Sequence, residues 1–304
     1  MQKKFQIVNH ILVETDSEQA PVTVVINPDD TEKHYLVDTL RIDEHTLASA
    51  LDPDELSRLE FEPEHLALIY KRPRSYTAAD QFLFKVSSVG AFLFKDKLIL
   101  VVSEDVPLAD GLHSMRVSSP AEMVLRLIYR AILHYREHLK VISAISDDLQ
   151  EKIAKSMENR HLLNLFTLQK SLVYYLNSIT SNTALLEKLK LNTTKIGFPT
   201  EEIELLDDIM IENNQCYKQA EIYSNILAGL MDARVSVVSN NLNMLMKTLN
   251  IITIAIMVPT LVVSAFSMNV HIPLQQHPYA FFIIMGLALL SVLSFLAFWR
   301  YRRW

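Results

Sequence analysis

The pattern of hydrophobic and polar positions divides the chain into two parts. From Phe5 to about Gly111, short β-branched and aromatic runs alternate with polar turns; Val22 to Ile26, for example, ends at the turn signal Asn27-Pro28-Asp29-Asp30. From about Ser118 the apolar residues recur every three or four positions, which is typical of helices. The pattern therefore predicts an α+β domain over residues 1–117, followed by long helices.

The first part contains further expected elements. Asp43-Glu44 opens a predicted helix that runs through Ala50, and Asp52-Pro53, followed by two acids, is typical of a second helix start. The remaining β-type runs are Tyr35 to Ile42, Leu66 to Tyr70, Phe82 to Val86, Val89 to Phe94 and Lys97 to Ser103. A mixed sheet with a few short helices is expected.

The second part predicts a helical layer and a stalk over residues 118–247. Ser119-Pro120 caps its first helix, and Gly197 ends one helix before Pro199 opens the next. From Thr200 no proline interrupts the pattern until Pro259, and about sixty residues of helix would span about 90 Å. Because a bilayer is much thinner, we interpret this helix as a stalk that becomes a membrane span.

Two membrane spans are predicted at the carboxyl end. Residues 248–299 contain no Lys, Arg, Asp or Glu, and they divide into a first span at 248–267, an external loop at 268–278 and a second span at 279–299. Lys247 precedes the first span and a basic tail, 300–304, follows the second. The positive-inside bias then places both termini in the cytoplasm of a multi-pass protein of a bacterial-type cell membrane.

A polar stripe runs from the stalk into the first span with alternating steps of three and four residues. Its members are Asn243, Met246, Asn250, Thr253, Met257, Thr260, Ser264 and Ser267. Amide and hydroxyl groups are costly in contact with lipid, so the stripe should face protein or water. Two interpretations remain open: a small-residue packing seam between helices, or the wall of a water-filled pore formed by several copies of this helix. A single Ser or Thr at such a position usually bonds only to its own backbone.

Composition excludes several classes of function. With 5 Gly in 304 residues and no phosphate-binding glycine motif, the chain predicts no nucleotide or other organic cofactor, and no catalytic motif indicates an enzyme. A net charge of -6 argues against binding to nucleic acid. The single cysteine, Cys216, excludes an intrachain disulfide and is interpreted as an inert thiol. No signal-peptide-like run follows the first residues.

Two clusters of metal-ligand residue types stand on the helices. His134 and His138 lie four positions apart, as zinc ligands can, but no third ligand is placed by the sequence. Asp147 and Asp148 with Glu151 are interpreted as a solvated acidic face. Neither cluster predicts a metal site.

The passage from stalk to membrane resembles the CorA family of divalent-cation channels. The resemblance is carried by Gly229-Leu230-Met231-Asp232, by the run from Ser239 to Leu249, and by Pro259 in the first span. Met268-Asn269 at the end of that span and Pro273 soon after it also match. The order of an α/β domain, long helices, a stalk and two spans extends the resemblance over the whole chain.

The resemblance implies a funnel-shaped homopentamer in the lipid bilayer, in which five first spans enclose a pore for Mg²⁺ or related divalent cations. The implied pore and selectivity residues are Asn269, Met268, Ser267, Ser264, Thr260, Met257, Thr253, Asn250, Leu249, Met246 and Asn243. Hydroxyl and amide oxygens suit hydrated Mg²⁺, which dehydrates reluctantly. The apolar Met246, Leu249 and Met257 could form constrictions that close by dewetting. Asp207 and Asp208 correspond to a regulatory site for Mg²⁺ between subunits, or simply to a solvated helix face.

The chain departs from the family pattern at the pore mouth. The family has Gly-Met-Asn, whereas this chain has Ser267 before Met268 and Asn269. If that position requires a positive φ, serine adopts it at a cost. The loop after Pro273 has no acid, and His271 and His277 lie near it. Two alternatives follow: a zinc or other divalent transporter of the same family, and a membrane-anchored sensor or scaffold that does not conduct.

Overall fold

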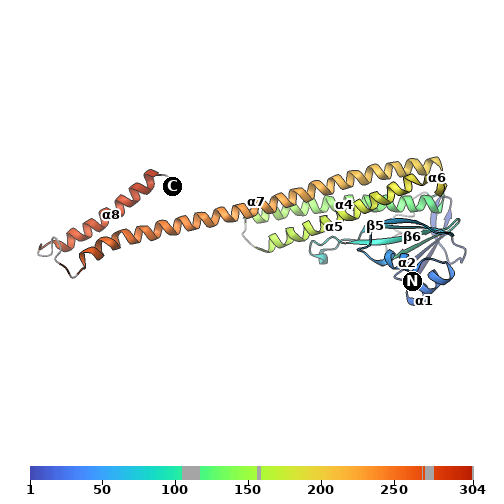
Figure 1. Cartoon of the computed structure of the whole chain (residues 1–304), viewed down its shortest axis with the longest axis horizontal. Helices are drawn as coiled ribbons and strands as arrows, with labels where there is room; N and C mark the ends of the chain where they lie inside the picture. The colour runs from blue at the N-terminus through green and yellow to red at the C-terminus, as the bar shows by residue number, and fades with distance from the viewer. Residues whose placement is uncertain (105–116, 156–158, 269, 271–276, 303–304) are drawn as a thin grey trace. The chain divides into compact units, whose positions relative to one another are not determined.

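The computed structural model describes the chain except for residues 105–116, 156–158, 269, 271–276 and 303–304 (Figure 1). It divides into two compact units, Met1–Met231 and Asp232–Trp304. The first unit contains a sheet and long helices, and the second contains the apolar part of the longest helix and one further apolar helix. The α+β domain followed by long helices and two apolar carboxyl-terminal helices is therefore confirmed.

A seven-stranded sheet forms the base of the first unit. Its order is β2-β1-β3-β7-β6-β5-β4, and only the central pair of β3 and β7 is parallel among the paired strands. The strands are β1 (Gln2–Val8), β2 (Ile11–Glu14), β3 (Val22–Ile26), β4 (Arg58–Phe61), β5 (Leu66–Pro73), β6 (Val86–Leu93) and β7 (Leu98–Val102). Both central strands are buried along their whole length, which explains their unbroken apolar sequences.

Helices cover both faces of this sheet. The short helices are α1 (Asp30–His34), the π-helical turn η1 (Tyr35–Thr39), α2 (Glu44–Leu51) and the 3₁₀ turn η2 (Ala78–Asp80). Of these, α2 packs on β5, β6 and β7, and Figure 1 shows α1 and α2 on the side of the sheet opposite α4 (Pro120–Lys155) and α5 (Asn159–Leu191). The expected strand Tyr35 to Ile42 is wrong. Asp29 and Glu32 form a capping box that starts a helix there instead.

Two other local predictions are wrong. Asp52-Pro53 opens no helix, because the Asp52 carboxylate accepts the amide of Asp54 at 2.9 Å in a local turn. The strand predicted at Phe82 begins only at Val86, since Gln81 and Phe82 have positive φ and the amide of Phe84 bonds to the Ser171 hydroxyl at 3.0 Å. The helix start at Asp43 is confirmed by its bond to the amide of Thr46.

The long helices begin and end close to their predicted signals. Ser119 accepts the amide of Glu122 at the start of α4, and Gly197, at φ 84°, ends the short helix α6 (Thr193–Ile196). α7 then runs from Thr200 to Phe266 with Pro259 inside it, and α8 spans Ala280–Arg302. Both α7 and α8 are long and apolar enough to cross a membrane.

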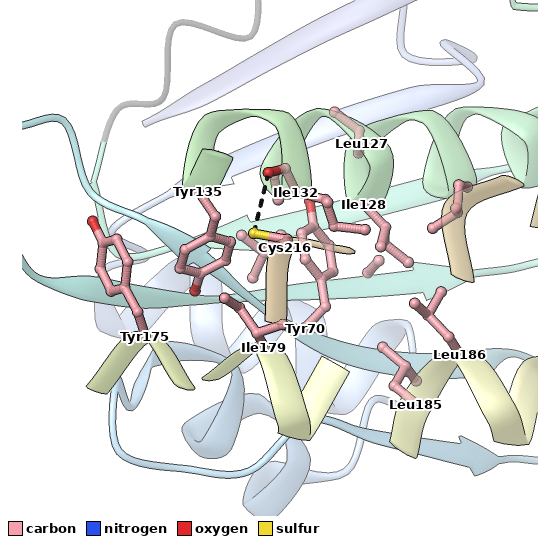
Figure 2. Packing of buried hydrophobic residues seen from close by; sticks show 14 of the residues in the cluster. Tyr70, Leu127, Ile128, Ile132, Tyr135, Tyr175, Ile179, Leu185, Leu186 and Cys216 are labelled. Atoms are coloured by element: carbon pink, nitrogen blue, oxygen red, sulfur yellow. Dashed lines mark hydrogen bonds between the residues drawn. The ribbon is translucent and has the colours of Figure 1, made fainter. Parts of the chain in front are cut away.

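The core of the first unit lies between the sheet and α4, α5 and the first part of α7. Figure 2 shows Tyr70 of β5, Tyr135 of α4, Tyr175 of α5 and Cys216 of α7 meeting in it. Cys216 is 1 % exposed, and burial raises its pKa to about 12. A thiol in this environment stays protonated, which agrees with the inert role expected from the sequence.

Candidate pore-lining helix

The polar stripe lies on the surface of the second unit. All of its described members are exposed in the single chain, and so are Leu249 and Met268; Met257, deep in the apolar segment, is 63 % exposed. Asn269, the residue on which the implied selectivity depends, lies outside the described residues. The stripe therefore reaches the end of the described helix without being covered by its own chain.

The opposite face of the same helix is partly buried. Its half-buried residues are Ile251, Ala255, Val258, Pro259, Val262 and Phe266. Residues two positions apart on an α-helix point about 160° away from one another, so Ala255 and Val262 lie almost opposite Thr253 and Thr260. α8 likewise has one half-buried face, centred on the buried Ala288. The stripe is therefore not the face that the second unit itself buries.

The hydroxyl groups of the stripe bond to their own helix. Thr253 donates to the carbonyl of Leu249 at 2.9 Å, Thr260 to that of Ile256 at 2.7 Å, and Ser267 to that of Ser264 at 2.9 Å. Thr248, which lies on another face, does the same with Met244. This is the ordinary behaviour of Ser and Thr in helices. It fixes the hydroxyl proton inward and leaves the oxygen as an outward-facing acceptor.

At the end nearer Asn243, the stripe borders a cavity of about 740 Å³. Three stripe residues line it together with Lys247 and residues of both apolar helices; the full lining is Asn243, Met246, Lys247, Asn250, Ile251, Ile254, Phe295, Phe298 and Trp299. Phe295 was not among the residues predicted from the sequence, although its place on the half-buried face of α8 follows from its spacing to Ala288. The residues further along the stripe, from Thr253 to Ser264, do not line this cavity.

Ser267 takes the place of the family glycine without backbone strain. It is not among the described residues with positive φ, and its amide and hydroxyl both bond to the carbonyl of Ser264. The expected cost of a serine at positive φ is thus wrong for this structure. The serine closes the last turn of α7, which ends at Phe266.

The two stalk carboxylates differ from one another. Both are exposed, but Asp207 accepts a bond from Lys190 of α5 at 2.7 Å. Within the described part of the chain, no three His, Cys, Asp or Glu residues gather into a group that could hold a metal. A regulatory ion at Asp207 and Asp208 would need ligands from another copy of the chain.

The remaining candidate clusters have structural explanations. His138 is buried, its Nδ1 lies 2.6 Å from the Tyr175 hydroxyl, and burial lowers its pKa to about 4, with His134 contributing. The rings of His134 and His138 touch edge to face, with centroids 4.3 Å apart. Asp148 pairs with Lys152 on the surface of α4. These are packing and surface contacts, as expected.

An α/β domain with long helices, two apolar helices and a polar stripe on one of them is typical of a membrane protein of the transporter class. The family model described as "CorA-like Mg2+ transporter protein" matches residues 24–303. The chain belongs to this family. Its members transport ions rather than catalyse reactions, so the chain is a CorA-like divalent-cation transporter and not an enzyme.

Individual relatives agree with this assignment. The chain is 24 % identical over 292 residues to the cobalt/magnesium transport protein CorA of Methanocaldococcus jannaschii, covering 91 % of this chain and 89 % of that protein. The complete structure of the CorA magnesium transporter from the same organism is 22 % identical, with a TM-score of 0.85 over 98 % of this chain and 96 % of that one. The full-length CmaX protein gives a TM-score of 0.73 at 16 % identity, covering 100 % and 97 % of the two chains.

Proposed function

We propose that this protein conducts a divalent cation, Mg²⁺ first, into the cytoplasm through a pore lined by the polar stripe of α7. The observation that carries the proposal is the exposure of the whole described stripe on the face opposite the partly buried one. Polar groups on that face need water or protein beside them within a bilayer. A water-filled pore supplies the water.

The back-bonded hydroxyls suit a hydrated cation. The waters held by Mg²⁺ direct their protons outward, so a pore that passes the hydrated ion should offer hydrogen-bond acceptors. Thr253 and Thr260 have their own protons bound to backbone carbonyls and present acceptor oxygens. Asn243 and Asn250 add amide oxygens nearer the stalk. The ion need not lose its water shell to move along such a wall.

One chain cannot enclose a pore, so the proposal includes a homopentamer, the assembly implied by the family resemblance. Five copies of the stripe would surround one axis, with Met246, Leu249 and Met257 as apolar rings between the polar ones. Apolar rings can close a pore by excluding water. Asp208, exposed and on the stalk, is the better placed of the two acids to meet a regulatory Mg²⁺ from another copy, since Asp207 already pairs with Lys190.

The direction of transport follows from the proposed orientation. Lys247 before the first span and Arg300 after the apolar part of α8 support an orientation with both ends in the cytoplasm. A negative membrane potential then drives a doubly charged ion inward with about 4.6 kcal/mol per 100 mV, twice the value for one charge. No nucleotide is required.

The test is Mg²⁺ entry into liposomes containing the purified protein, followed with an internal indicator. Thr253→Val removes an acceptor from the stripe with little change in shape, and we expect several-fold slower entry. Thr248→Val is the matched control, because its hydroxyl is back-bonded in the same way but lies on another face. Equal rates for the two variants would mean that the stripe does not line the pore.

The same liposomes distinguish the alternatives. Faster entry of Zn²⁺ than of Mg²⁺ would assign the chain to zinc transport. No entry of either ion above that of empty liposomes, with the oligomer intact by size-exclusion chromatography, would favour a sensor or scaffold that does not conduct.

A further inference from the structure

A group of cationic side chains lies at the end of β5 on the face covered by α4 and α5. Alternation along the strand places Tyr70, Arg72 and Arg74 on this face, and Tyr70 is 3 % exposed in the core. Arg72 is partly buried at the edge of that core. The amide of Arg74 bonds to the carbonyl of Lys85, which brings a third cationic residue alongside.

Among the described residues that line a cavity beside this group, the three cations Arg72, Arg74 and Lys85 face two acids, Asp80 and Glu104. Glu104 is engaged by Arg74 through two bonds, of 3.0 and 2.6 Å. Asp80 accepts the amide and hydroxyl of Thr77, both at 2.8 Å. In the part of the chain that the structure describes, Arg72 donates only to the carbonyl of Pro73, at 3.3 Å, and no carboxylate there lies within ion-pairing distance of it.

A further arginine lies near Arg72. Burial is the main cause that lowers the pKa of Arg72; Glu104 acts in the opposite direction, and the charge of Arg130 on α4 adds a smaller lowering. The pKa of His134, one turn along α4, is lowered by burial and by Arg72, while Glu137 raises it and Arg130 lowers it by a smaller amount. Burial is the largest cause for both residues, so Arg72 and His134 lie in a partly desolvated region. A guanidinium in such a place is costly unless an anion accompanies it.

A cavity of about 180 Å³ opens beside these cations. It is lined by Arg72, Arg74, Ser75, Tyr76, Asp80, Leu83, Lys85 and Glu104. One wall is fixed, because the Tyr76 ring stacks on the buried Phe84 with centroids 4.1 Å apart and planes inclined by 10°. At about 30 Å³ per water molecule, the cavity has room for a tetrahedral oxyanion with a few waters.

We propose that this cavity binds one oxyanion of the phosphate class, free or as the end of a phosphomonoester. Arg72 supplies the unpaired guanidinium, whose planar N–H groups match two oxygens of such an anion. Lys85 also lines the cavity, and the Ser75 and Tyr76 hydroxyls can donate to the remaining oxygens. The site belongs to the sheet-containing unit and is separate from the proposed pore.

The test is calorimetric titration of the full-length protein in detergent with inorganic phosphate at constant ionic strength. We expect saturable binding that weakens about tenfold or more in Arg72→Met, which removes the charge but keeps a long apolar side chain. Phosphoserine in a parallel titration identifies the source: tighter binding than phosphate indicates an organic phosphate, and weaker binding indicates the free ion. Both results support the site.

Two further variants keep the result interpretable. Lys85→Met changes an exposed residue of the same cavity and should also weaken binding, even if Arg72→Met fails to fold. Arg41→Met removes an exposed arginine that pairs with Glu64 outside the cavity and should bind as the wild type does. Absence of saturable phosphate binding by the wild type, or unchanged binding in Lys85→Met and Arg72→Met, would overturn the proposal.

Discussion

Polar side chains behave differently in the two units of this chain. In the first unit, buried polar groups join elements far apart in sequence: Asn182 of α5 bonds to the amide and carbonyl of Lys71 on β5, each at 2.8 Å, and accepts the Ser57 hydroxyl. In the second unit, the hydroxyls of Thr253 and Thr260 bond only four residues back along their own helix. The first arrangement holds the fold together, and the second does not.

Back-bonded hydroxyls in the first unit show what the stripe lacks. Thr183 donates to the carbonyl of Ile179, and its oxygen accepts the Asn213 amide at 2.8 Å. Ser171 donates to the carbonyl of Thr167, and its oxygen accepts the amide of Phe84. Each of these oxygens therefore meets a donor from another element. The corresponding oxygens of the stripe face outward, which is why we assign their donors to the waters of a passing ion.

The largest expected effect comes from breaking a cross-element bond. Asn182→Leu leaves the amide and carbonyl of Lys71 buried without their partner, and each buried group without a partner costs about 1–3 kcal/mol. We expect the first unit to lose about 3 kcal/mol of stability, measured as a fall in the thermal midpoint of the full-length protein. A midpoint equal to that of the wild type would show that this polar contact does not hold the helix to the sheet.

A smaller effect is expected from acid. Burial lowers the pKa of His138 to about 4 in the folded chain, whereas an unfolded histidine takes up its proton near pH 6.5. Between these values the unfolded state binds more protons, so stability falls as the pH falls from about 6.5 to 4, at up to about 1.4 kcal/mol per pH unit.

The measurement is chemical denaturation across that pH range for the wild type and for His138→Phe, which keeps a ring beside Phe84 and Tyr175. The wild type should show the steeper dependence. Parallel curves for the two proteins would mean that the pKa of His138 is the same in the folded and unfolded states, and the buried contact with Tyr175 would then need another description.

The sequence predicted elements where local and tertiary preferences agree. β3 has the predicted bounds, because a β-branched run buried on both faces favours the same conformation at both levels. The strand predicted at Tyr35 is wrong because the capping box at Asp29 and Glu32 outweighs the β-type composition that follows it. The helix start predicted at Asp52-Pro53 is wrong because of a contact with another element. The Lys71 ammonium binds the carbonyls of Asp52 and Pro53, which helps to hold the chain in a turn there.

The stripe could be read from the sequence because its period is a property of one helix. Its exposure on the face away from the buried one required the structure, since the sequence left a packing seam and a pore wall equally open. The surroundings of Arg72, by contrast, could not be predicted from the sequence. Its alternation with Tyr70 was visible, but its lack of a carboxylate partner depends on which side chains α4 and the neighbouring loops bring to it.

The smallest expected effects on stability come from comparing a back-bonded hydroxyl of the first unit directly with one of the stripe. Thr183→Val removes the acceptor for Asn213 and should cost about 1 kcal/mol. Thr260→Val makes the same chemical change to a back-bonded hydroxyl whose oxygen contacts no other element. Its free energy of unfolding should therefore change by less than about 0.5 kcal/mol. Its effect should appear instead in Mg²⁺ entry, slowed several-fold in liposomes. Loss of stability equal to that of Thr183→Val, with unchanged entry, would mean that the stripe packs against a protein surface rather than against the water of a pore.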